Sequence, residues 1–163
     1  MSIIRFSIIL CLVSVLHGSG AAAASAQNGP VPLAERARSA DRIVVGRVAS
    51  INPAWQVNEF GDRLIVSTLR VAIEETLKGE PQPVVNVDIE GGTVGDLTLR
   101  VSDVSSFVAG ERAVFYLRRN ARGALVPHLR GQGLLKLDRS DRVFDSTVTL
   151  SDIRRSVVTG RAR

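Results

Sequence analysis

The residue with the clearest capacity for chemistry is His128, the only histidine beyond the first two dozen residues. An imidazole can act as a general base near neutral pH. His128 follows Pro127 in an apolar stretch, however, and no G-x-S-x-G motif supplies a nucleophilic serine. One histidine and scattered carboxylates also lack the spacing of a metal-ligand set. We therefore expect a packed or surface histidine, no metal site and no cofactor.

Carboxylates offer the next possibility. Asp88 and Glu90 lie two residues apart in a run of alternating polar and apolar residues. A glycosidase needs two carboxylates about 5 to 9.5 Å apart across a cleft, but neighbours on the wet face of a strand reach such distances without any catalytic role. The sequence thus predicts no catalytic residue and a protein that is not an enzyme, with an enzyme using dispersed carboxylates as the third-ranked reading.

Residues suited to binding are more distinctive. Residues 52–62 form a polar stretch that carries Trp55 and Phe60, and an exposed tryptophan is a typical anchor for a protein partner. The alternative, in which Trp55 folds back over one end of the domain, is at least as well supported. The pair Gly91-Gly92 predicts a second turn. We expect these two segments to form the contact edge.

Arginines on predicted strand faces define a second candidate surface. Arg47, Arg70 and Arg112 can line the face that OB-type barrels use for ligands, and their planar guanidinium groups suit carbohydrates or anionic polymers. Nucleic acid binding would require aromatic platforms among these charges, for which Tyr116 is the best candidate. No nucleic acid partner is predicted.

The N-terminus has the pattern of an export signal. Arg5 precedes an apolar run of about eleven residues, and Ala24-Ser25-Ala26 matches the A-x-A cleavage pattern. The run is too short for a membrane anchor, which needs about 20 apolar residues. We expect residues 1–26 to be removed, the mature chain to begin at Gln27 in the periplasm or outside the cell, and no stable membrane span to remain.

The composition fits one exported domain without disulfide bonds. The formal net charge is +5, and Cys11, the only cysteine, lies within the predicted signal. Disulfides, thiol catalysis and cysteine-rich zinc sites are therefore excluded from the mature chain.

Apolar periodicity predicts mainly strands. Alternation is clearest at Val85, Val87 and Ile89, and the odd residues from Ala113 to Leu117 suggest a central strand with Phe115 buried. Asn52 and Pro53 are expected to end the first strand. We divide the chain into a leader with a short helix (27–41), a β domain (42–150) and a C-terminal helix capped by Ser151 with a basic tail (151–163). The predicted fold is all-β with short terminal helices, a small closed or partly open antiparallel barrel of OB type.

Four segments resemble the netrin-like module: residues 40–48, the end of the second strand at 77–79, Gly91-Gly92, and residues 110–117. That module is the OB-type barrel of tissue inhibitors of metalloproteinases, and secreted bacterial domains also resemble it. The resemblance implies the fold. Those inhibitors chelate the protease zinc through a free N-terminal cysteine, which has no counterpart at Gln27.

These observations together predict an exported, non-enzymatic domain that binds a protein partner through barrel loops. The alternative is a binder of carbohydrate or an anionic polymer that uses the arginine-bearing face. Salt dependence separates the two, because contacts with a polyanion weaken steeply with ionic strength.

Overall fold

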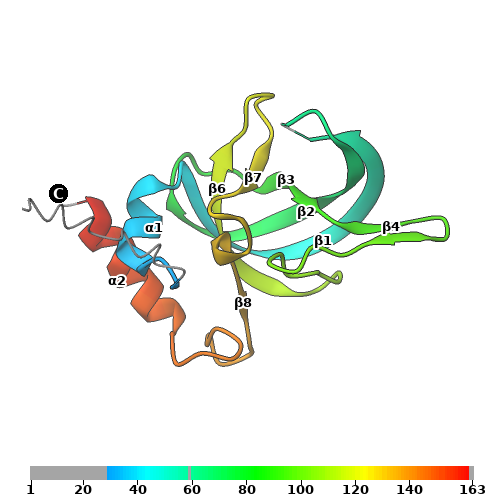
Figure 1. Cartoon of the computed structure of the whole chain (residues 1–163). Helices are drawn as coiled ribbons and strands as arrows, with labels where there is room; N and C mark the ends of the chain where they lie inside the picture. The colour runs from blue at the N-terminus through cyan, green and yellow to red at the C-terminus, as the bar shows by residue number, and fades with distance from the viewer. Residues whose placement is uncertain (1–28, 59, 162–163) are drawn as a thin grey trace, which may run out of the picture.

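A computed structural model describes residues 29–58 and 60–161, so the predicted export signal lies outside the described residues. Figure 1 shows a strand-rich body with two helices at one side. In chain order the elements are α1 (Leu33–Ser39), β1 (Arg42–Val57), β2 (Arg63–Lys78), β3 (Val84–Glu90), β4 (Gly92–Val94), β5 (Leu97–Leu99), β6 (Arg112–Arg119), β7 (Leu125–Pro127), a 3-10 turn η1 (Arg130–Gly133), β8 (Leu134–Leu137) and α2 (Leu150–Arg161).

Six strands form one mixed sheet in the order β1-β2-β3-β7-β6-β8, and a further pairing of β1 with β6 closes five of them into a ring. The mostly β prediction is confirmed. The expectation of a purely antiparallel sheet is wrong at one place, because β3 and β7 pair in parallel, through Val87 and Leu125 alone. Strands β4 and β5 form a separate hairpin, which projects to the right in Figure 1.

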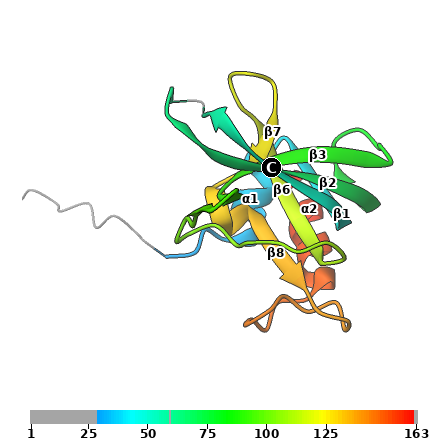
Figure 2. The ribbon, with the colours of Figure 1, turned by 90° about the vertical axis from the view of Figure 1, so that its right-hand side faces the viewer.

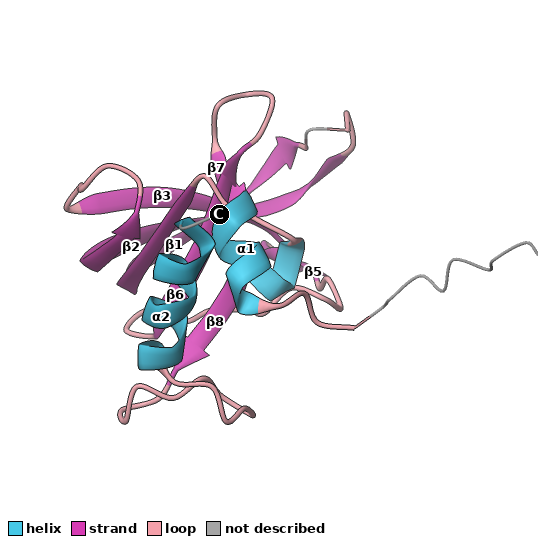
Figure 3. Ribbon diagram, turned by 90° about the vertical axis from the view of Figure 1, so that its left-hand side faces the viewer, coloured by secondary structure: helices cyan, strands magenta, loops and turns pink. Residues whose placement is uncertain are grey.

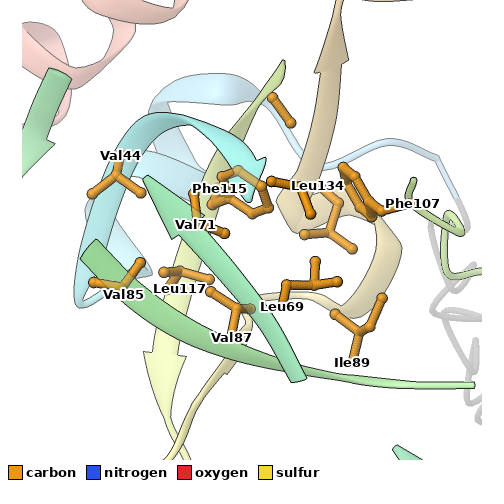
Figure 4. Packing of buried hydrophobic residues seen from close by; sticks show 12 residues of the cluster. Val44, Leu69, Val71, Val85, Val87, Ile89, Phe107, Phe115, Leu117 and Leu134 are labelled. Atoms are coloured by element: carbon orange, nitrogen blue, oxygen red, sulfur yellow. The ribbon is translucent and has the colours of Figure 1, made fainter. Parts of the chain in front are cut away.

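The first hydrophobic core fills the inside of the ring. Period-2 alternation turns Leu69 and Val71 of β2 and Val87 of β3 toward it, as the sequence predicts. Figure 4 shows these side chains around Phe115, which is fully buried and stacks on Phe107 with ring centroids 5.7 Å apart. The predicted burial of Phe115 is therefore confirmed.

A second core lies on the opposite face of β1 and β6, where α1 and α2 cover the strands (Figure 3). Val114 and Tyr116 point into this layer and are fully buried beside Ile153 and Val157 of α2. The suggestion that Tyr116 offers an aromatic platform on a wet face is therefore wrong. Burial raises the pKa of its phenol.

Strand β1 continues past Pro53 to Val57, so the predicted strand end and the loop over residues 52–62 are wrong. Antiparallel neighbours alternate between pairs that exchange hydrogen bonds and pairs that do not. Gly91 donates to the Ile65 carbonyl and Ile73 to the Pro83 carbonyl, so odd residues of β2 bond to β3. Pro53 lies opposite one of them, Ser67. Its nitrogen consequently faces away from β2, where a missing N–H costs no ladder bond.

Helix α2 begins two residues earlier than a cap at Ser151 predicts, and its cap is Thr149. The Asp152 carboxylate accepts hydrogen bonds from the Thr149 N–H (2.8 Å) and hydroxyl (2.6 Å), while the Asp152 N–H donates to the Thr149 hydroxyl (3.2 Å). This reciprocal arrangement satisfies donors at the helix start. Neither helix of the described chain has the length and apolarity needed to cross a bilayer.

Candidate functional site

The outer part of the β1–β2 ribbon, residues 53–66, forms what we call the distal hairpin. Asn58 organises its turn: the side-chain oxygen accepts from the N–H groups of Phe60 (2.9 Å) and Asp62 (2.9 Å), and the Asn58 N–H donates to the Asp62 carbonyl (2.8 Å). Phe60 is 75% exposed at the tip. The turn thus presents an aromatic side chain to solvent on a hydrogen-bonded support.

Trp55 lies on β1 of the distal hairpin rather than in a loop, and it is 42% exposed. The Arg63 guanidinium carbon lies 5.4 Å from the centre of its ring, within the range of a cation–π contact. One face of the indole is thus occupied by its own hairpin. Trp55 is thus partly packed against its own hairpin and partly exposed to solvent.

A second turn supports the distal hairpin. The β6–β7 turn, residues 120–124, is closed by the Asn120 side-chain oxygen, which accepts from the N–H groups of Arg122 and Ala124 (both 3.0 Å). The Arg122 guanidinium then donates to the carbonyls of Val57 and Asn58, the latter at 2.6 Å. The two turns lie side by side in Figures 1 and 2, and this clamp holds them together.

Between the two turns and β3 lies a pocket of about 350 Å³. Apolar side chains line part of it and charged ones the remainder. The apolar set includes Phe60, Val66, Ile89, Val104, Val126, Pro127 and Leu129, and the charged set is Asp88, Glu90, Arg118, Arg122 and Arg130. Of the residues proposed from the sequence, Phe60 alone belongs to this lining, while Trp55 lies on the same hairpin.

Part of the charge around the pocket is internally compensated. Arg130 forms two hydrogen bonds with Asp103 (2.6 and 3.1 Å), which lower the pKa of that carboxyl, and its guanidinium lies 3.5 Å from Glu90. Asp88 accepts from the Thr68 hydroxyl at 2.6 Å. Arg122 differs, because its guanidinium donates to backbone carbonyls and forms no ion pair with a carboxylate within the described chain.

Gly91 and Gly92 have a structural role outside the pocket. The Ser67 hydroxyl donates to the Gly91 carbonyl (2.7 Å), and a Cβ on Gly92 would lie 2.4 Å from that hydroxyl oxygen. Gly92 also has φ of +132°, a conformation that favours glycine. The pair lets the β4–β5 hairpin pack against the distal hairpin.

The structure brings Arg47 and Arg112 together, directly opposite each other across β1 and β6. Both pair with Glu74, at 3.3 Å and 2.5 Å, and Arg112 also pairs with Asp141. Arg70 lies four residues from Glu74 on the same strand, and its side chain makes no ion pair or hydrogen bond within the described part of the chain. Carboxylates therefore neutralise much of the predicted arginine face.

His128 has a partner that sequence reasoning missed, Ser39, which is 89 residues away in the chain. The Ser39 hydroxyl donates to the Glu35 carbonyl (2.8 Å), so it accepts from the His128 Nε2–H at 2.8 Å. Nδ1 is buried without a partner, and burial lowers the pKa of the ring. A general base of the Ser-His-Asp type needs a carboxylate at Nδ1 and an Nε2 that accepts a proton, and His128 has neither arrangement here. The Ser39–His128 hydrogen bond instead connects α1 to the segment after β7.

Nowhere in residues 29–58 and 60–161 do three or more histidine, cysteine or acidic side chains gather as metal ligands. No protein-family model matches the chain, and no curated protein matches its sequence.

Proposed function

We propose that this chain is an exported, non-catalytic domain that binds a protein partner through the distal hairpin and the pocket beside it. The observation that carries this proposal is the exposure of Phe60 on a turn fixed by Asn58 and clamped by Arg122. Aromatic side chains next to a pocket are typical binding anchors. A preformed turn also lowers the ordering entropy that association would otherwise cost.

The proposal includes a netrin-like barrel of OB type as the scaffold. Two features support it: the ring of five strands, β1-β2-β3-β7-β6, and the position of the pocket. OB-type barrels bind ligands on the face of their second and third strands, between the first hairpin loop and the loop joining the last two strands of the ring. The pocket occupies the equivalent place, beside β3 and between the β1–β2 and β6–β7 turns.

Export is the second component and follows from the N-terminal pattern. Mass spectrometry of the protein recovered from the envelope or medium of the exporting cell is expected to place the N-terminus within a few residues of Gln27. Recovery of an exported form that retains Met1 would contradict this part of the proposal.

The alternative, a binder of carbohydrate or an anionic polymer at Arg47, Arg70 and Arg112, has weaker support. Glu74 and Asp141 already pair with two of these three arginines. A polyanion would have to compete with those carboxylates. Titration of heparin at rising salt concentrations would reveal such binding through a steep loss of affinity.

The test of partner binding compares three forms of the protein as bait in an envelope extract of the exporting cell. Wild type is compared with Phe60→Ala and with Phe144→Ala, which removes a second exposed phenylalanine (59% exposed) outside the pocket. We expect one protein to be retained by wild type and Phe144→Ala and lost with Phe60→Ala. Equal retention by all three forms, or by none, would contradict the proposed site.

A further inference from the structure

The β3 edge beside the pocket extends beyond the single residue pair that joins β3 to β7. Because odd residues of β2 and β3 exchange the hydrogen bonds of this pair, as the Gly91-to-Ile65 and Ile73-to-Pro83 bonds show, even residues of β3 direct their N–H and C=O groups to the other side. That side faces β7, which pairs with β3 at Val87 alone. Beyond this point, no further residue pair joins β3 to β7 within the described part of the chain.

Pro127 gives the physical reason that the β3–β7 ladder stops. In a parallel ladder, the residues of one strand that bond to its neighbour are two apart. Leu125 pairs with Val87, so residue 127 is the next of β7 to face β3. It is a proline and has no N–H to donate to the Asp88 carbonyl. The ladder therefore stops there, and we call the space beyond its last pair, which the pocket borders, the opening.

The backbone groups, apolar side chains and charges around the opening indicate which kind of ligand could bind there. Backbone donors and acceptors at strand spacing match an extended peptide, which can add to a sheet edge through main-chain hydrogen bonds. Ile89, Val126 and Leu129 provide an apolar floor for one side chain. Arg122, which forms no ion pair with a carboxylate within the described chain, complements an acidic residue of the peptide.

We propose that the edge of β3 at residues 88–90 binds an extended peptide segment of the protein partner as an added strand. An apolar side chain of that segment fills the pocket, and an acidic residue pairs with Arg122. This inference rests on the proposed protein-binding function and specifies how the partner is recognised. A second copy of this chain is the other occupant considered, and the test distinguishes the two.

The experiment selects a phage-displayed library of random twelve-residue peptides on the purified protein. The best binders are synthesised in two N-methylated versions, in which alternate backbone N–H groups are blocked in one register or the other. An added strand uses every second N–H for pairing. We therefore expect one register of methylation to weaken binding about tenfold or more and the other to be tolerated.

Pro127→Ala supplies the protein-side test, with Pro81→Ala in the exposed β2–β3 connection as the matched control. Restoring an N–H at residue 127 allows the ladder to extend to Asp88 and narrows the opening. We expect selected peptides to bind Pro127→Ala about tenfold more weakly than wild type, and Pro81→Ala to match wild type.

Each remaining outcome overturns the inference. Peptides that tolerate both registers of methylation would show side-chain recognition alone, and a library without binders would exclude peptide addition. Protection of the Glu90 amide in the protein alone, increasing with its concentration, would identify a second copy as the occupant. None of these results would affect the capture experiment with Phe60→Ala, so failure of this inference is distinguishable from failure of the proposed function.

Discussion

The two ends of the β1–β2 ribbon are built differently although the strands are continuous. At the inner end, β1 pairs with β2 on one side and β6 on the other, and its residues Ile43, Val44 and Val45 are fully buried between the ring interior and the helical layer. At the outer end, β1 pairs with β2 alone. There Trp55 and Phe60 are exposed.

The difference separates stability from recognition. Burial on both faces stabilises the inner end, because each fully buried large apolar side chain contributes about 1.5–3 kcal/mol. In the distal hairpin only Ile65 and Val66, at its base, are buried among the described residues, and the remainder depends on the Asn58 turn, the Arg122 clamp and the packing of Gly92. Mutations at the inner end should therefore change unfolding, and mutations of exposed residues at the outer end should change binding.

The largest expected effect on stability is that of Phe115→Ala. This substitution removes a fully buried ring, which is also the ring on which Phe107 stacks. We expect a loss of about 3–5 kcal/mol in the free energy of unfolding, measured by urea denaturation. Phe60→Ala is the control from the outer end and should stay within about 0.5 kcal/mol of wild type. Similar losses in both variants would abolish the contrast between the two ends.

Gly92→Ala tests whether the outer end also depends on tight packing. The added Cβ would lie 2.4 Å from the Ser67 hydroxyl oxygen, at a backbone φ of +132°. Overpacking and backbone strain each cost about 1–3 kcal/mol, so we expect a loss of about 2–4 kcal/mol in the free energy of unfolding.

Gly95→Ala is the matched control, because Gly95 has φ of +58° and a Cβ there would meet no atom within 4 Å. It should cost about 1–2 kcal/mol from the backbone alone. Equal losses in the two variants would show that contact with Ser67 contributes nothing.

Much of the fold can be predicted from local patterns. Alternation at Val85, Val87 and Ile89 assigns the inward face of β3 correctly, because one face of that strand is buried and the other is wet. Alternation predicts a wet position for Tyr116, but both faces of β6 are covered. The second face is covered by α1 and α2, and the local sequence of β6 does not reveal this packing. Pro53 misleads for a related reason, because only the register shows that its nitrogen faces away from β2.

The candidate site is less accessible to sequence reasoning. Phe60 and Trp55 are recognisable because aromatic residues are unusual in a polar stretch. The pocket combines the distal hairpin, β3 and the β6–β7 turn, which only the strand order brings together. The Arg122 clamp and the opening at Pro127 have no local signal for the same reason.

A smaller effect is expected for pH. Burial lowers the pKa of His128 in the folded protein, with the charges of Arg118 and Lys78 in the same direction and Asp41 opposing them. The folded state thus binds fewer protons than the unfolded state, whose histidine titrates near about 6.5. The associated stability is present above that pH and is lost as the pH falls below it.

Melting temperatures recorded between pH 8 and pH 5 should therefore fall less steeply for His128→Gln than for wild type, because the glutamine amide can still donate to Ser39 but does not titrate. Parallel curves for the two proteins would exclude His128 as the source of the pH dependence.

The subtlest contrast concerns single amides of β3. The Ile89 N–H faces β2 and is hydrogen-bonded, whereas the Glu90 N–H points away from β2, toward the side where β7 has its last pair with β3 at Val87. We expect hydrogen exchange by NMR to be markedly faster at Glu90 than at Ile89, with no change in global stability. Equal protection of the two amides would mean that the edge is already paired.

The central claim, that the outer end of the ribbon binds a protein partner, is tested most directly by pairing a thermal melt with an affinity titration on Phe60→Ala, using the protein captured from the envelope extract. The account predicts an unchanged melting temperature and an affinity weaker by at least about 2 kcal/mol, roughly thirtyfold, because an anchor in a pocket contributes this much. Phe144→Ala should leave both quantities unchanged. An unchanged affinity of Phe60→Ala, or a loss no larger than that of Phe144→Ala, would contradict the account.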